Sequence, residues 1–289
     1  LFAGGLAHRA LQVALRRVGG GRRRYRKRGR AAPAVAQYSL YTDYSVFRSD
    51  IRHPRWPLAA SRLRSASAAR ARRVREDPMD EEHYDKELKD LNLKKLPESI
   101  YDFDIRGAFK FGDAEFLYQI IRLLKPKKFV EIGSGSSTKI AYQALKKNKE
   151  ETNTKSEHIC IEPYEMPWLE DLGVKVIRKL AEDCDPNIFS SLEENDILFI
   201  DSSHIIRPQG DVLKEYLEIV PTLKKGVYVH VHDIFTPRDY LDEWIRDEVY
   251  FWNEQYLLEA LLSDSNKYEV VAALNYLYHN NFNELKFNH

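Results

Sequence analysis

A short apolar run that ends in two closely spaced glycines sets the framework of this chain: Lys-Lys-Phe-Val-Glu-Ile-Gly-Ser-Gly-Ser-Ser-Thr at 127–138. The apolar run predicts a buried strand, and apolar residues at helical spacing after the glycines predict a helix. Glycines let the backbone approach a ligand closely, and a helix N-terminus offers N–H groups and partial positive charge. The segment therefore predicts a site for a nucleotide-like ligand.

The loop lacks the features of two common nucleotide sites. The dinucleotide fingerprint needs a third Gly or Ala three residues after the second Gly, and Thr138 stands there. The loop also lacks the Gly-Lys-Ser/Thr ending of a P-loop. An acid, Glu131, stands two residues before the first glycine.

Further strands are expected at 158–161, 174–177, 196–200, 227–232 and 268–274, alternating with helical patterns. This alternation predicts an α/β fold with a doubly wound, mostly parallel sheet. Polar residues close several strands: Glu131, Glu162, Asp201, and His232 with Asp233. Because ligands of such sheets bind outside the carboxyl ends of the strands, we expect these side chains to gather at one edge.

Residues from about 100 to 286 resemble the class I S-adenosylmethionine-dependent methyltransferases, most closely their family 24 branch. The resemblance rests on Glu-Ile-Gly-Ser-Gly at 131–135, Phe-Ile-Asp-Ser-Ser-His at 199–204 and His-Asp-Ile-Phe-Thr-Pro at 232–237. It also includes Leu-Tyr-Gln-Ile-Ile-Arg at 117–122, followed by Lys-Pro at 125–126. The resemblance implies a Rossmann-like fold, S-adenosylmethionine as the cofactor, and a small molecule or sugar as the methyl acceptor, methylated on oxygen.

In this family the glycine loop surrounds the amino acid part of the cofactor, and the acid before it reaches the ammonium group. An acid that closes the second strand can accept hydrogen bonds from a ribose, which favours Glu162 over a plain surface or capping role. Asp183 falls where the fold meets the adenine, with a surface acid as the alternative. The expected cofactor-binding residues are Glu131, Gly133, Ser134, Gly135, Ser137, Glu162, Asp183 and Asp201.

The expected catalytic residues are Asp201, His204, His232 and Asp233. Asp201 and Asp233 resemble, by position, the metal-binding acids of catechol-type O-methyltransferases, so Mg²⁺ is a candidate second cofactor. His204 and His232 are candidate bases, because imidazole titrates near neutral pH. In the alternative reading Asp201 only orients the acceptor and Asp233 caps a turn.

Composition divides the chain. Residues 1–75 hold 18 Arg and one Lys against two acids, a balance of +17, and the remainder carries −16. We expect residues 1–78 to be a disordered Arg/Ala-rich extension and residues 79–289 to be the methyltransferase domain. For the extension, a nucleic-acid tail, an organelle transit peptide and an untypical upstream segment stay open. The acidic balance argues against nucleic acid as a partner of the folded domain.

No apolar run reaches the ~18 residues of a membrane span, and Cys160 and Cys184 show no disulfide or metal spacing. We therefore expect two inert thiols and a cytoplasmic protein. A helix is expected from Trp244 to Leu262, with Trp252 and Tyr256 either lining an acceptor pocket or packing on the sheet. Two other functions stay open: an NAD(P)-dependent oxidoreductase, and a catalytically silent methyltransferase-fold protein that binds a partner.

Overall fold

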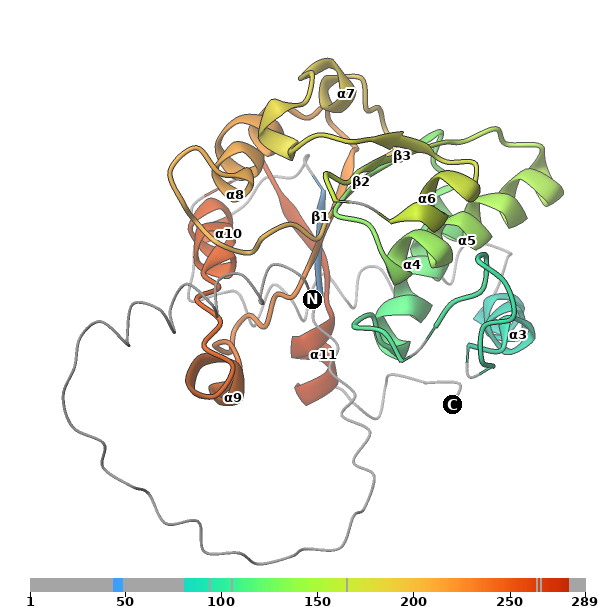
Figure 1. Ribbon diagram of the computed structural model, residues 1–289, viewed down its shortest axis with the longest axis horizontal. Helices are drawn as coiled ribbons and strands as arrows, with labels where there is room; N and C mark the ends of the chain where they lie inside the picture. The colour runs from blue at the N-terminus through green and yellow to red at the C-terminus, as the bar shows by residue number, and fades with distance from the viewer. Residues whose placement is uncertain are drawn as a thin grey trace, which may run out of the picture. The chain divides into compact units, whose positions relative to one another are not determined.

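The structure is a computed structural model that describes residues 44–48, 81–93, 95–104, 106–164, 166–263, 265 and 267–280. Helices and strands alternate along most of this range (Figure 1). The strands are β1 Tyr44–Arg48, β2 Lys128–Ile132, β3 Glu157–Ile161, β4 Lys175–Ile177, β5 Ile197–Ile200, β6 Tyr228–His232 and β7 Glu269–Ala273. The helices are α3 Glu81–Leu91, α4 Phe111–Leu124, α5 Ser136–Thr152, α6 Pro167–Asp171, α7 Asn187–Ser190, α8 Asp211–Lys214, α9 Asp242–Arg246, α10 Glu254–Ser263 and α11 Leu274–Asn280, with short turns at Ala181–Asp183, Glu215–Ile219 and Val220–Thr222.

The described strands form one seven-stranded sheet in the order β4-β3-β2-β5-β6-β1-β7. Strands β2 to β6 pair in parallel, as the sequence predicted. Apart from β1, this is the doubly wound order 3-2-1-4-5-6, which reverses direction between β2 and β5. Ligands of such sheets bind at that reversal, outside the carboxyl ends of the strands.

Strand β1 enters the sheet from the segment that we expected to lie outside the fold. It pairs antiparallel with β6 on one side and with β7 on the other. The expectation for residues 1–78 is therefore corrected at Tyr44–Arg48, and the rest of that segment lies outside the described residues. The backbone groups of β1 find their hydrogen-bond partners in β6 and β7, which are distant in sequence. Local composition therefore does not reveal this strand.

Two apolar layers cover the sheet, because successive side chains of a strand point to opposite faces. On one face Phe129 and Phe199 pack with apolar residues of α4 and α5. On the other face Val130 and Leu198 pack with residues of the segments that include α7, α8 and α10. Figure 1 shows α4 and α5 on one side of the sheet and α8 and α10 on the other. The strands are thus buried on both faces, as in other parallel sheets.

A buried ion pair joins the helices of the first layer. Arg122 of α4 is fully buried and donates to both carboxylate oxygens of Glu87 in α3, each at 2.8 Å. It also donates to Asn148 and Glu151 of α5. A buried guanidinium needs such partners, because its charge is otherwise costly to remove from water.

The helical region expected from Trp244 to Leu262 is interrupted in the structure. The structure has α9 and α10 instead, and residues 242–250 belong to a separate compact unit. Within that unit, the Tyr250 N–H donates to the Trp244 carbonyl. Helix α10 begins only at Glu254, where the N–H groups of Asn253 and Glu254 both donate to the carbonyl of His204. This tertiary contact satisfies N–H groups that a helix start leaves without intrahelical partners.

Across the described residues, none of the helices has the length and apolar character needed to cross a bilayer.

Candidate functional site

The two glycines of the loop after β2 differ in what requires them. A Cβ on Gly133 would lie 1.9 Å from the backbone oxygen of Asp201, and its φ of +80° disfavours other residues. A Cβ on Gly135 would meet nothing within 4 Å, and its backbone is extended. Gly133 is thus required by packing within the protein, whereas Gly135 faces open space that a ligand can enter.

Glu131 lies beneath this loop and is fully buried. Its carboxylate accepts hydrogen bonds from the hydroxyls of Ser137 at 2.6 Å and Thr138 at 2.7 Å. The Gly135 N–H in turn donates to Thr138 Oγ1 at 3.0 Å. Glu131 and Ser137 therefore hold the loop against the sheet, and the structure does not direct them at the expected ammonium group.

Glu162 closes β3 and is also buried. Its Oε2 accepts from the Ser134 N–H at 3.1 Å, and its Oε1 accepts from the Tyr164 N–H at 2.9 Å. Each carboxylate oxygen offers about two acceptor positions, so one position on each oxygen stays open for a ribose hydroxyl. The geometry places Glu162 and Ser134 side by side at the loop.

Asp183 ends the short turn after β4 and is exposed. Its neighbour Glu182 pairs with Arg207 at 3.1 Å, which links this turn to the segment after β5. The expected adenine contact of Asp183 stays a prediction.

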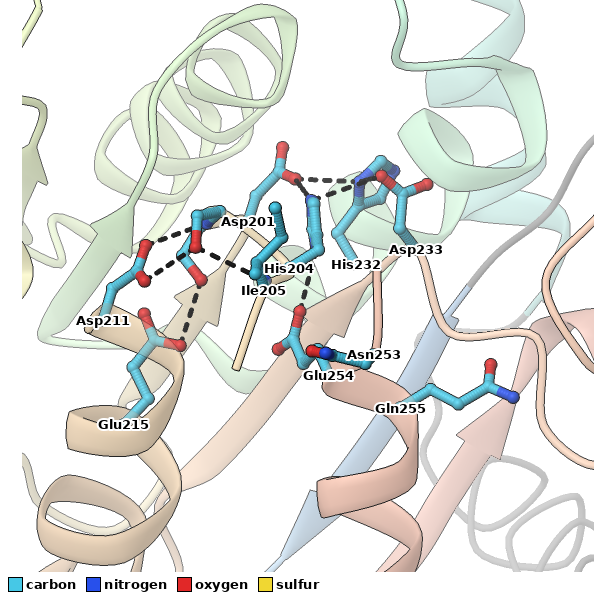
Figure 2. A network of polar contacts seen from close by, with 12 residues as sticks. Asp201, His204, Ile205, Asp211, Glu215, His232, Asp233, Asn253, Glu254 and Gln255 are labelled. Atoms are coloured by element: carbon cyan, nitrogen blue, oxygen red, sulfur yellow. Dashed lines mark hydrogen bonds and ion pairs between the residues drawn. The ribbon is translucent and has the colours of Figure 1, made fainter. Parts of the chain in front are cut away.

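The four expected catalytic residues lie together, and we call them the rim cluster: Asp201, His204, His232 and Asp233. Oδ1 of Asp201 lies 3.3 Å from His204 Nε2 and 3.1 Å from His232 Nδ1. Oδ2 of Asp233 lies 3.4 Å and 3.3 Å from the same two nitrogens. Figure 2 shows the two imidazoles between the two carboxylates. The predicted convergence of these strand-end side chains is therefore present.

Negatively charged carboxylates and positively charged imidazoles alternate in the rim cluster. Burial disfavours charge on Asp201, but the nearby His232 and His204 hold the pKa of its carboxyl far below the usual value. Burial likewise disfavours charge on His204 and His232, but the carboxylates facing them raise the pKa of both imidazoles well above the usual value. At neutral pH the ligand-free cluster therefore holds ionised Asp201 between two protonated imidazoles.

Two members of the cluster have a left-handed backbone, His204 at φ +58° and Asp233 at φ +54°. Such conformations are uncommon outside glycine and persist where surrounding contacts enforce them, often at functional sites. The segment before His204 is held in this way, because Ser203 donates to Asp211 through its N–H at 2.9 Å and its hydroxyl at 2.7 Å.

Sequence reasoning missed the polar residues Asn253 to Gln255, which contact both loops of the rim cluster. Glu254 is fully buried; its Oε2 lies 2.7 Å from His204 Nδ1, and its Oε1 accepts from the Tyr216 hydroxyl at 2.7 Å. Gln255 accepts from the Phe235 N–H at 3.0 Å. The available signal was a polar Asn-Glu-Gln run inside an otherwise aromatic and apolar stretch.

The aromatic residues near the cluster have separate places. The Trp252 ring lies 4.4 Å from that of His204, whereas Tyr256 is exposed and donates to Asp239 instead. Phe109 stacks on His232 at 5.4 Å. Trp252 thus lies beside the expected acceptor side, and Tyr256 does not contact the rim cluster.

The rim cluster fits Mg²⁺ poorly. Ligand atoms of Asp201, His204 and Asp233 lie within 4.8 Å of one another, a spacing that a metal ion could use. Mg²⁺, however, takes oxygen ligands and keeps several waters. Here imidazole nitrogens face the carboxylate oxygens from both sides and supply the positive charge that would otherwise come from a cation. The expected Mg²⁺ role of Asp201 and Asp233 is therefore not supported by the donor set.

A second group of potential ligands, Glu131, His158 and Cys160, is buried under the glycine loop. Burial and the adjacent Glu131 raise the pKa of the Cys160 thiol, so it stays protonated at neutral pH. A protonated thiol is a poor nucleophile. Cys160 and Cys184 are both free and buried, as expected.

Comparison with known proteins shows which family this part of the chain is similar to. Residues 130–234, which include the glycine loop and the rim cluster, match a family model described as a methyltransferase domain. This segment is therefore similar to methyltransferase domains. The doubly wound sheet has the Rossmann-like fold expected from the resemblance, and the match to a methyltransferase domain speaks against the NAD(P)-dependent alternative.

Two further similarities accompany this match. The chain is 35% identical over 94 residues to an uncharacterized protein of Archaeoglobus fulgidus. The aligned part covers 31% of this chain and 41% of that protein. The chain thus spans well under half the length of this curated relative. The SAH-bound methyltransferase PaMTH1 of Podospora anserina is similar at 18% identity and a TM-score of 0.33, over 62% of this chain and 75% of that one.

Proposed function

We propose that the protein is an S-adenosylmethionine-dependent methyltransferase that methylates an oxygen of a small molecule or sugar. The observation that carries the proposal is the joint position of the glycine loop and the rim cluster. Gly133 at one and Asp201 at the other pack backbone against backbone, within the segment that matches the methyltransferase domain. A cofactor in the space next to Gly135 would therefore lie beside the acids that close β3 and β5.

Residues of this chain would hold S-adenosylmethionine as follows. The open space at Gly135 takes the part of the cofactor nearest the loop, and the free acceptor positions of Glu162 take the ribose hydroxyls. Asp183 would receive the adenine amino group. S-adenosylmethionine supplies an activated methyl group, so the protein mainly aligns the acceptor and removes a proton.

The rim cluster would act on the methyl acceptor. Asp201 and Asp233 would orient the acceptor hydroxyl. An imidazole would accept the hydroxyl proton as the oxygen attacks the activated methyl group in line. The imidazoles are protonated in the ligand-free cluster, but a cationic cofactor beside them disfavours their charged form. Binding of the cofactor would therefore prepare the base. His230, which lies within β6, is instead buried among aromatic rings, and burial lowers its pKa well below the usual value.

The proposal is tested by incubating the full chain with methyl-labelled S-adenosylmethionine and fractions of a metabolite extract. We expect label to pass to a small molecule in at least one fraction, and His204→Ala to remove that transfer while S-adenosylhomocysteine still binds. Addition of excess chelator should not change the transfer, because the donor set does not favour Mg²⁺. Cofactor binding without transfer to any fraction would instead support a silent methyltransferase-fold protein.

A further inference from the structure

The start of α10 is fastened to the loop that carries His204. The N–H groups of Asn253 and Glu254 donate to the His204 carbonyl at 2.9 Å and 3.2 Å. The Asn253 side chain accepts from the Ile206 N–H. Trp252 packs on the His204 ring from the same segment. Three consecutive residues, Trp252 to Glu254, thus fix the loop that carries His204, although 50 residues separate the two segments in sequence.

Within this contact Glu254 is the group that reaches the imidazole itself. Its Oε2 lies 2.7 Å from Nδ1, while the other ring nitrogen, Nε2, faces Asp201 and Asp233 (Figure 2). A carboxylate oxygen only accepts hydrogen bonds, so at this distance the Glu254 carboxylate accepts the Nδ1–H. The ring then has one defined orientation, with Nε2 at the rim.

We propose that Glu254 is the positioning residue of the rim cluster: it holds the His204 ring so that Nδ1–H faces inward and Nε2 faces the acceptor side. Tyr216 completes the arrangement by donating to the second oxygen of Glu254 at 2.7 Å. This inference rests on the proposed function in one respect only, namely the reaction in which Nε2 of His204 takes part. The orientation of the ring is a property of the protein without any substrate.

The position of Glu254 is hard to explain by folding stability alone. A fully buried carboxylate is costly, and replacing a buried polar pair by apolar residues is often neutral or stabilising. A second buried acid, Glu215, lies close by, and burial together with the charge of Glu254 raises its pKa well above the usual value. Packing alone does not call for an acid at this position, whereas an acceptor at Nδ1 fixes which imidazole nitrogen carries the proton.

Glu254 also makes the two histidines of the cluster unequal. His204 presents Nε2 to the carboxylates, whereas His232 presents Nδ1 to them and stacks on Phe109. Since Glu254 contacts His204, we infer that His204 is the imidazole whose ring is prepared for proton transfer.

Nuclear magnetic resonance of the imidazole protons tests this without knowledge of the acceptor. A buried Nδ1–H bound to a carboxylate gives a slowly exchanging proton signal at low field, which His204→Gln would assign by its loss. We expect the signal to disappear in Glu254→Ala and to remain, shifted, in Glu254→Gln, because the amide oxygen still accepts. Glu259→Gln is the matched control on the same helix, where Glu259 accepts from Thr236 and is remote from His204.

An unchanged His204 signal in Glu254→Ala would overturn the proposal. If that variant does not fold, Glu254→Asp serves instead, because the shorter side chain withdraws the carboxylate from Nδ1 and the signal should again be lost. Titration of each variant with S-adenosylhomocysteine separates this inference from the proposed function. Once an acceptor is known, we expect Glu254→Ala to lower kcat roughly 10²-fold, with KM little changed and Glu254→Gln restoring part of the loss.

Discussion

The backbone N–H of Ser134 donates to the Glu162 carboxylate at 3.1 Å, which joins the glycine loop to the end of β3. A single side chain therefore supports the loop and offers acceptor positions to a ribose. We expect Glu162→Ala to weaken binding of S-adenosylhomocysteine by about 1–3 kcal/mol, roughly 5- to 150-fold. Calorimetry measures the change, with Glu157→Ala, an exposed site on the same strand, as the control. Equal affinity of the two variants would remove Glu162 from the cofactor site.

We expect replacement of Glu131 to lower the stability of the fold more directly than the affinity for the cofactor. Its carboxylate holds the hydroxyls of Ser137 and Thr138, and its replacement leaves these buried donors without their acceptor. We expect Glu131→Ala to lower the free energy of unfolding by about 1–3 kcal/mol, seen as a lower melting temperature. A constant melting temperature with a lower affinity would instead favour the contact with the cofactor's ammonium group that the family resemblance implies.

Strand β1 predicts different outcomes for two shortened chains. A chain that begins at Leu40 keeps β1, whereas one that begins at Met79 leaves the facing edges of β6 and β7 without their partner. We expect the melting temperature of the second chain to be lower by about 5 °C or more, since each 1 kcal/mol is worth roughly 2–4 °C in a domain of this size. Identical melting curves for the two chains would show that β1 contributes nothing to the fold.

The sequence predicted the parallel strands and their closing acids well, because both follow from local pattern. Apolar runs such as 197–200 can form little else in an α/β chain, and parallel strands bring their ends to one edge. The burial of Glu131 was harder to see. It follows from the alternation of β2, which puts Glu131 on the same face as Phe129, under α5.

The features that could not be predicted depend on contacts between distant segments. β1 stands in an Arg-rich stretch, and only its pairing with β6 and β7 shows that it is a strand. The start of α10 depends on the His204 carbonyl, so an apolar helical pattern alone extended the helix too far toward its N-terminus. Glu254 was missed for the same reason, since its role is defined by a loop 50 residues earlier.

Calorimetric titration of S-adenosylhomocysteine into the parent protein and into Gly135→Val tests the central claim most directly. A Cβ at Gly135 meets nothing within 4 Å and the backbone there is extended, so the variant should fold with an unchanged melting temperature. The added side chain would occupy the space assigned to the cofactor. We predict saturable binding by the parent and none by Gly135→Val. No binding by the parent, or equal binding by both proteins, would contradict the assignment of this loop as the cofactor site of a methyltransferase.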